Sequence, residues 1–306
     1  MALESHRSLI DLALENADLV QIRRLSILGY IDSPTRQRVW SFLLGIDEEG
    51  GEEDGERYRG ESHPNMDTVA KDVARSLCNY DICQEWTQSR LECERGKLSW
   101  MINTIMCRHS GYLHYIQGYH DVCAVFLIVC DYQEKMAIKL CEKVSQLHLR
   151  EILRPNLDVV IEVLNMLFPL LSSADPQLAK FLARANAQSF FALSWVLTWF
   201  SHTLEKFDDV ARIFDFLLAS HPCMPLYIAA AFVQDHRDGL FQVECDMPMI
   251  HHYFQTHTTV DLQRLLPNAM KLFKSYPVGA LKIVANPYSP ITANKSVPPL
   301  PTQIPS

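Results

Sequence analysis

The sequence predicts an all-α fold, and three observations favour it. Glycine and proline, which interrupt helices, number 27 among 306 residues, and ten of them lie in two segments, 47–63 and 285–306. The other 267 residues therefore hold 17, well below the average usage of about 12%. Apolar side chains recur at spacings of three and four, as on one helix face, and no stretch alternates apolar and polar residues as half-buried strands do. Typical helix lengths suggest about 13 to 16 helices.

Several stretches carry this helical pattern. Residues 155–171 read as one amphipathic helix, with Asp158 near its start. Residues 189–207 are apolar nearly all round up to His202, which predicts a single helix at the centre of a core. Further helices are expected within 1–27, 211–219, 226–233 and 262–273. The sequence shows no repeat of fixed length.

Composition excludes several classes of protein. The net charge of −8 opposes binding to phosphate backbones, so no nucleic-acid partner is expected. The longest uncharged apolar stretches, 190–200 and 222–233, are shorter than the roughly 18 residues that a membrane span needs, and the charged first 15 residues lack a signal-peptide core. Nine scattered cysteines without a C-x-x-C pair indicate reduced thiols in the cytosol.

Two segments differ from the rest in composition. Residues 47–63 hold eight acidic residues, two arginines and four glycines, which predicts a flexible acidic surface loop, whose role stays open. Residues 285–306 hold six prolines and a single charged residue, Lys295, which predicts a disordered Pro-rich tail. We expect an N-terminal helical extension at 1–27, followed by one domain over 28–284 that includes the acidic loop.

Common catalytic motifs are absent from the sequence. It contains no phosphate-binding loop, no dinucleotide-binding glycine motif, no hydrolase elbow and no H-E-x-x-H zinc motif. His236, Arg237 and Asp238 match the start of a kinase catalytic loop, but Val243 stands where a metal-binding asparagine is required. His251 and His252 are adjacent, so on a helix they would not face one metal ion. We therefore expect neither a metal site nor a cofactor of the chain's own.

Two short segments remain as candidates for function. In the first, Asp72 and Arg75 are three residues apart, so the carboxylate can orient the guanidinium. In the second, Gly118 permits a tight turn that presents Gln117 just ahead of an apolar helix. Each also has an ordinary explanation, because Arg75 can be half of a surface ion pair and Gln117 can cap a helix.

These segments resemble the paired motifs of the TBC domain, the catalytic module of Rab GTPase-activating proteins. The pattern V-x-x-D-x-x-R occurs at 69–75 and Y-x-Q-G at 115–118. The stretch from Arg36 to Trp40 resembles the opening R-x-x-V-W motif, and the helix around Asp215 resembles a later D-x-L-L motif. The resemblance covers residues 28 to about 277. Val69 stands where the family most often has isoleucine.

The resemblance implies a fold, a set of site residues and a partner. The fold is that of two helical subdomains forming a V-shaped groove. Arg75 and Gln117 would be catalytic, and the supporting or Rab-binding residues would be Arg36, Trp40, Asp72, Tyr115, Gly118 and Asp121. The partner would be a Rab GTPase in its GTP-bound state, and the chain would act on GTP and Mg²⁺ held by that Rab, without substrate turnover of its own. Arg75 and Gln117 should therefore line one solvent-open groove.

One ER-associated branch of the family matches further stretches, at 119–121, 191–200 and 218–225. That branch implies a role in ER-to-Golgi vesicle traffic and a cytosolic domain that a C-terminal membrane segment, outside these residues, would anchor at the ER.

Two other functions stay open on the sequence. A TBC-like helical scaffold could bind a Rab or a vesicle protein without accelerating hydrolysis, although it would have no chemical need for both Arg75 and Gln117. A helical-repeat adaptor would require a period of about 30 to 45 residues, which the sequence lacks.

Overall fold

The computed structural model describes residues 2–46 and 61–285, and within them the chain is helical with no β-strand. The described residues form seventeen α-helices and two 3-10 helices, which confirms the all-α prediction and slightly exceeds the expected number. The first seven helices are α1 (Ala2–Glu15), α2 (Leu19–Leu25), α3 (Ser33–Leu44), α4 (Met66–Val73), α5 (Gln88–Arg108), α6 (Tyr119–Val129) and α7 (Glu134–Leu147).

The later helices are mostly short. They are α8 (Asp158–Asn165), α9 (Leu167–Ala174), α10 (Pro176–Arg184), α11 (Leu193–Leu197), α12 (Phe207–Leu218), α13 (Met224–Asp235), α14 (Arg237–Leu240), α15 (Met247–Thr256), α16 (Leu262–Ser275) and α17 (Val278–Ala285). The 3-10 helices η1 (Asp81–Cys83) and η2 (Ser189–Ala192) connect longer elements.

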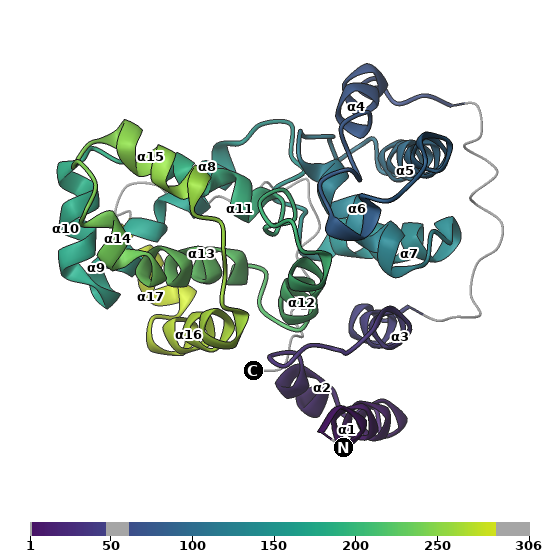
Figure 1. Cartoon of the computed structure of the whole chain (residues 1–306), viewed down its shortest axis with the longest axis horizontal. Helices are drawn as coiled ribbons and strands as arrows, with labels where there is room; N and C mark the ends of the chain where they lie inside the picture. The colour runs from purple at the N-terminus through teal and green to yellow at the C-terminus, as the bar shows by residue number, and fades with distance from the viewer. Residues whose placement is uncertain (1, 47–60, 286–306) are drawn as a thin grey trace.

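The helices gather into two groups (Figure 1). One group contains α4, α5, α6 and α7, and the other contains α8 to α11 together with α13 to α17. Helix α12 lies between the groups and packs against α3, α6 and α16. This arrangement places the start of α6 opposite α11 across the space between the groups, and the site described below lies there.

The predicted helix over 155–171 is wrong in its continuity, because the structure divides this region into α8 and α9 at Met166. Pro169 explains the break. Proline has no N–H to donate to the carbonyl of Asn165, four residues earlier, and its ring clashes with that carbonyl. The helical ladder therefore restarts one turn ahead of the proline, where a missing N–H is tolerated.

The prediction for 189–207 is right about burial and wrong about continuity. The segment forms η2 and α11 and then leaves the helix, with left-handed backbone at Trp199 (φ 51°) and Phe200 (φ 65°). Bulky residues rarely adopt these angles. Both rings are almost fully buried, and Trp199 packs edge-on against Phe214 at 5.1 Å between ring centroids, so aromatic burial offsets the backbone strain.

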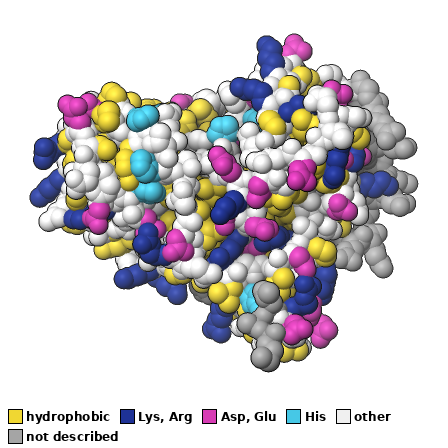
Figure 2. All heavy atoms as spheres, in the orientation of Figure 1, with side chains coloured by type: hydrophobic (Ala, Val, Ile, Leu, Met, Phe, Trp, Pro, Cys, Tyr) yellow, Lys and Arg dark blue, Asp and Glu magenta, His cyan; other side chains and the backbone are white. Residues whose placement is uncertain are grey.

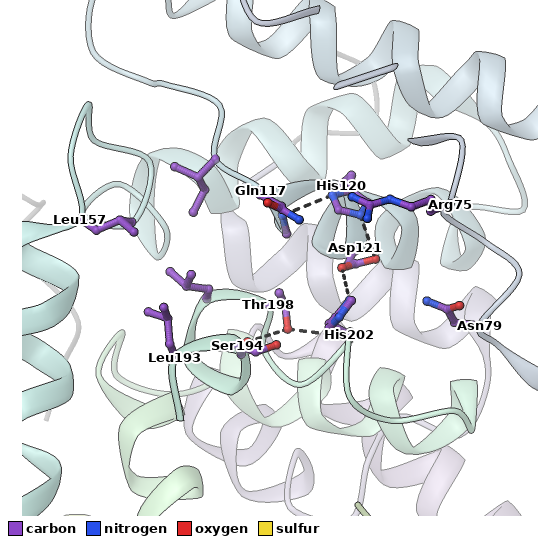
Figure 3. Close-up of a pocket in the computed structure, with 13 residues that line it drawn as sticks. Arg75, Asn79, Gln117, His120, Asp121, Leu157, Leu193, Ser194, Thr198 and His202 are labelled. Atoms are coloured by element: carbon purple, nitrogen blue, oxygen red, sulfur yellow. Dashed lines mark hydrogen bonds and ion pairs between the residues drawn. The ribbon is translucent and has the colours of Figure 1, made fainter. Parts of the chain in front are cut away.

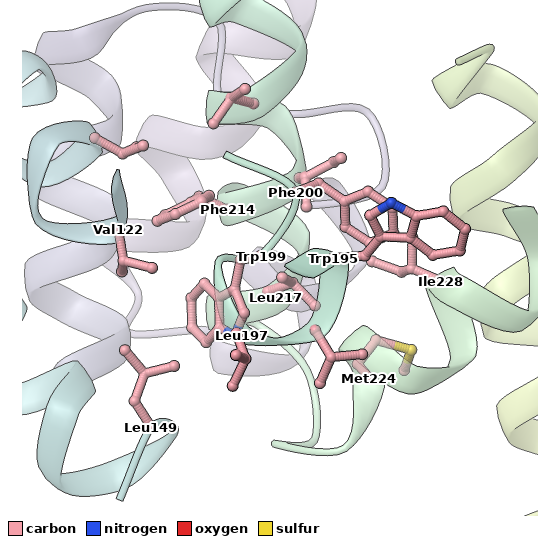
Figure 4. Close-up of a cluster of buried hydrophobic side chains, with 14 of the residues drawn as sticks. Val122, Leu149, Trp195, Leu197, Trp199, Phe200, Phe214, Leu217, Met224 and Ile228 are labelled. Atoms are coloured by element: carbon pink, nitrogen blue, oxygen red, sulfur yellow. The ribbon is translucent and has the colours of Figure 1, made fainter. Parts of the chain in front are cut away.

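The same aromatic side chains form the centre of the molecule. Figure 4 shows Trp195, Trp199, Phe200 and Phe214 among aliphatic neighbours from α6, α12 and α13. Trp195 stacks on Phe200 at 5.9 Å and meets Phe232 edge-on at 4.8 Å. Burial of such large rings is the main stabilising contribution in a core of this kind, and it fixes the segment that forms one wall of the site.

The acidic segment is only partly described. Residues 47–60 lie outside the described residues, as do residues 286–306 of the tail predicted over 285–306, whose first residue, Ala285, ends α17. The end of the segment is anchored: the His63 N–H donates to Asn103 Oδ1 at 2.9 Å, and the Asn103 amide donates to the Glu61 carbonyl at 2.8 Å. These bonds join the last residues of the predicted loop to α5.

None of the helices described here combines the length and apolar character that crossing a membrane requires. All nine cysteines lie within the described residues, where no disulfide joins any two of them.

Candidate functional site

Arg75 lies in the turn directly after α4. Val69 and Val73 bury the inner face of this helix, and Leu77 enters the core beyond it with left-handed backbone (φ 68°). The Arg75 N–H closes the last turn by donating to the Asp72 carbonyl at 3.0 Å. The chain is therefore held on both sides of Arg75, while the arginine side chain itself is 66% exposed.

Asp72 holds the guanidinium of Arg75, as the spacing of the two residues predicts. Arg75 Nη2 donates to Asp72 Oδ1 at 2.6 Å, and the hydroxyl of Tyr115 donates to Asp72 Oδ2 at 2.8 Å. The carboxylate is only 4% exposed, so it has lost most of its contact with water and uses both oxygens in these bonds. Burial and the neighbouring carboxylate raise the pKa of Tyr115, which keeps its hydroxyl protonated as a donor.

Gln117 is presented by the turn that precedes α6. Gly118 is the N-cap residue of α6 and has φ of 100°, as the sequence predicts for a tight turn at this glycine. A Cβ at position 118 would lie 2.9 Å from Thr198 Cγ2, so a larger residue would also clash with the opposite wall. Gln117 is exposed, and no hydrogen bond joins its side-chain amide to another described residue.

The start of α6 carries a polar network behind Gln117. The Gly118 N–H donates to His120 Nδ1 at 3.3 Å, and His120 Nε2 lies 3.4 Å from Asp121 Oδ1. Burial lowers the pKa of His120, so the ring is neutral near pH 7. A neutral ring with its proton on Nε2 fits both neighbours, because Nδ1 then accepts from the Gly118 N–H and the Nε2–H lies near the Asp121 carboxylate. His202 Nδ1 lies 2.9 Å from the other oxygen of Asp121.

These residues line one open cavity of about 630 Å³ between α6 and α11. Figure 3 shows Arg75, Gln117 and Asp121 from one wall facing Thr198 and His202 from the other. One part of the lining is apolar and comes from Ile116, Leu157, Leu193 and Leu197. The polar lining residues are Arg75, Asn79, Gln117, His120, Asp121, Ser194, Thr198 and His202. The expectation that Arg75 and Gln117 share a solvent-open groove is confirmed.

Arg36 and Trp40, two of the six expected supporting residues, lie outside this cavity. Arg36 Nε donates to both oxygens of Asp215, at 3.1 and 3.3 Å, and the Trp40 indole N–H donates to Asp215 Oδ1 at 2.8 Å. Both side chains are buried between α3 and α12, so they can support the fold but cannot contact a partner directly. Trp40 also packs on Phe126 of α6, at 5.3 Å between ring centroids, which links it indirectly to the site.

Of the other four supporting residues, Gly118 and Asp121 line the cavity, and Asp72 and Tyr115 are linked to it through the hydrogen bond from Arg75 to Asp72. The sequence interpretation did not assign Asn79, His120 or His202 to the site, nor its apolar wall. His120 stands inside the motif region, but its link to the Gly118 N–H depends on the turn. His202 lies 81 positions beyond Asp121, and no spacing rule indicates their contact.

The cavity is lined by hydrogen-bond donors, which suit a bound anion better than a metal ion. Its potential donors are a guanidinium, two amides, two imidazoles and two hydroxyls. Among the described residues, no three His, Cys, Asp or Glu side chains gather as metal ligands would. Over the described part of the face in Figure 2, acidic and basic side chains alternate without a large area of one sign.

Comparison with known proteins places this chain in a family. A family model for the Rab-GTPase-TBC domain matches residues 33–241, about two thirds of the sequence. The chain belongs to the Rab-GTPase-TBC domain family, whose members include GTPase-activating proteins for Rab.

Several curated proteins are similar to this chain along most of its length. TBC1 domain family member 20 of Bos taurus is 33% identical over 284 residues, which cover 91% of this chain and 69% of the relative. The Homo sapiens protein of the same name is 33% identical over 86% of this chain and 65% of its own length. The GTPase-activating protein gyp10 of Schizosaccharomyces pombe is 26% identical over 92% of this chain. The resemblance to one branch of the family is thus confirmed, and the chain spans about two thirds of the length of the first two relatives.

Two solved structures share the fold. The Ypt/Rab-GAP domain of Gyp1p aligns with a TM-score of 0.65 at 16% identity, over 85% of this chain and 94% of that domain. The Chlamydomonas flagellar RabGAP TBC domain aligns with a TM-score of 0.57 at 17% identity, over 87% of this chain and 94% of that domain. The predicted TBC-domain helical fold is confirmed.

Proposed function

We propose that this chain accelerates GTP hydrolysis by a Rab GTPase, with Arg75 and Gln117 both supplied in trans to the nucleotide. One observation carries the proposal: an exposed guanidinium, held by a buried carboxylate, lines the same open cavity as an exposed glutamine amide. Neither group needs such a position for the stability of the fold, and both are suited to a charged ligand that arrives with a partner.

Arg75 has the chemistry that phosphoryl transfer requires. Charge spreads over the phosphoryl oxygens in the transition state, and an arginine placed there in trans contributes roughly 10³ to 10⁵ in rate. A guanidinium can donate to two oxygens at once. The hydrogen bond to Asp72 occupies one nitrogen of Arg75, so its other donors remain available and the side chain is oriented before the partner arrives.

Gln117 has the chemistry to orient the attacking water. A carboxamide accepts one hydrogen bond and donates another, so it can hold a water molecule in line with the terminal phosphate. Its position at the tip of the Gly118 turn places the amide at the cavity surface. In this proposal Gln117 takes the place of the glutamine that the GTPase itself provides, and GTP and Mg²⁺ remain bound to the partner.

The proposed setting is vesicle traffic from the ER to the Golgi, with the domain on the cytosolic face of the ER membrane. This part of the proposal depends on the similarity to the TBC1 domain family member 20 proteins, which spans most of this chain.

Single-turnover GTP hydrolysis by a panel of purified Rab GTPases tests the proposed chemistry. We expect the wild-type chain to accelerate at least one Rab, and Arg75→Ala and Gln117→Ala each to remove most of the acceleration. Matched controls are Arg264→Ala, another exposed arginine paired with an aspartate (59% exposed, 3.2 Å from Asp235), and Gln255→Ala, an exposed glutamine of α15. Both controls should keep wild-type activity.

The outcomes separate the proposal from a binding scaffold. A scaffold would bind a GTP-loaded Rab without changing its hydrolysis rate. Retention of full activity by both cavity variants would contradict the roles given to Arg75 and Gln117. A Rab whose own switch glutamine is replaced by leucine should still respond, since Gln117 is proposed to supply that amide; a variant Rab that fails to respond while wild-type Rab does would contradict the role of Gln117 alone.

A further inference from the structure

His202 is an exposed side chain in an otherwise buried segment. It follows the left-handed residues Trp199 and Phe200, and its preceding neighbours Phe200 and Ser201 are 0% and 2% exposed, whereas the His202 side chain is 57% exposed. The Tyr80 hydroxyl donates to the Ser201 carbonyl at 3.1 Å, and the His202 N–H donates to Thr198 Oγ1 at 3.3 Å. The backbone is therefore fixed, and the ring projects into the cavity (Figure 3).

The ring has one nitrogen engaged and the other available. His202 Nδ1 lies 2.9 Å from Asp121 Oδ2, and a carboxylate only accepts, so Nδ1 carries a proton. Asp121 is itself buried, and its other oxygen lies 3.4 Å from His120 Nε2, so an imidazole flanks each of its two oxygens. Within the described residues, Nε2 of His202 has no hydrogen-bond partner.

We propose that His202 is a third contact residue of this site, which donates a hydrogen bond from Nε2 to an oxygen acceptor of the bound GTPase–nucleotide complex. The inference rests on the proposed function, because it assigns another group in the same cavity. Arg75 and His202 then meet the partner from opposite walls, with Asp121 as the positioning residue for the imidazole as Asp72 is for the guanidinium.

The charges around His202 favour its protonated form. Asp121 and His120 face it from α6, and Arg75 faces it from the turn after α4. The hydrogen bond to Asp121 raises the pKa of His202 above its ordinary 6.5, against burial and the positive charge of Arg75. The ring therefore holds its second proton to a higher pH than a free histidine, and it loses the Nε2 donor as pH rises through that pKa. Binding through Nε2 should weaken in the same direction.

Steady-state kinetics with a responsive Rab test the contact. His202→Ala should raise the half-saturating Rab concentration about tenfold, as expected for a lost charge-assisted hydrogen bond, with little change in the rate at saturation. His202→Gln can restore a neutral donor and should recover part of the loss. His252→Ala, an exposed histidine of α15, is the control and should behave as wild type. Equal half-saturating concentrations for wild type and His202→Ala would overturn the proposal.

The pH profile separates a contact from a purely structural role. In the wild type, the half-saturating Rab concentration should rise with pH across the titration of His202, and in His202→Ala this dependence should disappear. A structural defect would raise the value equally at every pH. An unchanged pH profile in His202→Ala would therefore overturn the proposal.

The nucleotide bound to the Rab can be varied to find which group supplies the acceptor oxygen. Affinities for a Rab loaded with GDP plus beryllium fluoride and with GDP alone should be measured for wild type and His202→Ala. If the acceptor belongs to the terminal phosphate, whose place beryllium fluoride takes, the tenfold loss is confined to the beryllium fluoride complex. An acceptor on the GTPase protein gives the loss in both complexes. Equal affinities of the two chains for the beryllium fluoride complex overturn the contact. If Arg75→Ala abolishes activity while His202→Ala does not alter it, only the present inference fails.

Discussion

Two arginine–aspartate pairs in this molecule have the same chemistry and opposite settings. The Arg36–Asp215 pair is closed, with side chains that are 6% and 0% exposed. The Arg75–Asp72 pair has an equally buried carboxylate, at 4%, but its guanidinium is 66% exposed. In both pairs the aspartate accepts further hydrogen bonds from buried aromatic residues, Trp40 in the first case and Tyr115 in the second.

The difference shows how one interaction serves either the fold or the site. Asp215 also accepts from the Tyr30 N–H at 2.9 Å, so it joins the N-terminal region, α3 and α12 in one buried cluster. Burial raises the pKa of Asp215, and the guanidinium of Arg36 opposes that rise. Asp72 fixes an arginine that remains open to a partner. An exposed guanidinium on a buried carboxylate is thus the feature that distinguishes the candidate site.

The largest expected effect comes from Arg75→Lys. An ammonium cannot reproduce the two-pronged donation of a guanidinium, so GTP hydrolysis with a responsive Rab should slow by about 10³-fold. The free energy of unfolding should stay within about 0.5 kcal/mol of wild type, since the side chain is mostly in water. Activity and denaturant unfolding measured on the same preparation check both parts, and a variant that loses stability together with activity would erase the distinction between the two pairs.

Arg36→Ala should show the reverse behaviour. Removing the guanidinium leaves Asp215 buried without its cation, which should lower the free energy of unfolding by about 3 kcal/mol. The activity of the remaining folded protein, corrected for the folded fraction, should stay near wild type because Arg36 lies outside the cavity. Urea denaturation provides the measurement. An unchanged denaturation midpoint would mean that the closed pair contributes nothing to the fold.

Gln117 is held by backbone geometry where Arg75 is held by a carboxylate, and Gly118→Ala tests that contrast. The left-handed φ and the 2.9 Å approach to Thr198 Cγ2 should cost about 1 to 2 kcal/mol in unfolding free energy and displace Gln117, which lowers activity. Gly118→Ala combined with Thr198→Ser removes the clashing methyl and should recover part of the loss. Gly96→Ala in α5, where a Cβ meets nothing within 4 Å, is the control and should not destabilise.

The smallest effect concerns a third pair, Arg7–Asp32, in which both side chains are about half exposed. Burial alone would raise the pKa of Asp32, but hydrogen bonds from Thr35 and Arg7 outweigh it and lower the value to about 2. A depressed carboxyl pKa stabilises the fold above the unfolded pKa of about 3.9, and this contribution is lost as pH falls toward 2. Asp32→Asn keeps a helix cap and should flatten this acid dependence by less than about 1 kcal/mol. Unfolding free energies from pH 5 to pH 2 give the comparison; identical slopes would contradict it.

The helical class, the Asp72–Arg75 contact and the turn at Gly118 could be predicted from the sequence because each depends on residues that are close in the chain. The i, i+3 spacing of Asp72 and Arg75 fixes their contact within a single turn, and a glycine before an apolar helix indicates the turn at Gly118. Burial of 189–207 followed from its composition. These predictions depend on residues close in the chain, where geometry is set by the backbone itself.

The parts that were missed depend on tertiary contacts. The break at Trp199 and Phe200 exists because packing against Phe214 and Trp195 offsets an unfavourable backbone, which no propensity of tryptophan or phenylalanine indicates. His202 reaches the cavity only because of that break. Pro169, by contrast, was a readable signal for the end of α8, since proline excludes the helical bond to the residue four positions earlier.

The carboxylate of Asp72 also couples two segments of the site. One of its oxygens accepts a hydrogen bond from Arg75, in the turn after α4. The other accepts from Tyr115, in the loop that leads into Gln117. Both segments therefore depend on the same carboxylate. Substitutions at Arg75 and Tyr115 should show a coupling energy in unfolding free energy or activity instead of adding independently. Natural variation in one segment is then constrained by the other, although the two lie 40 positions apart.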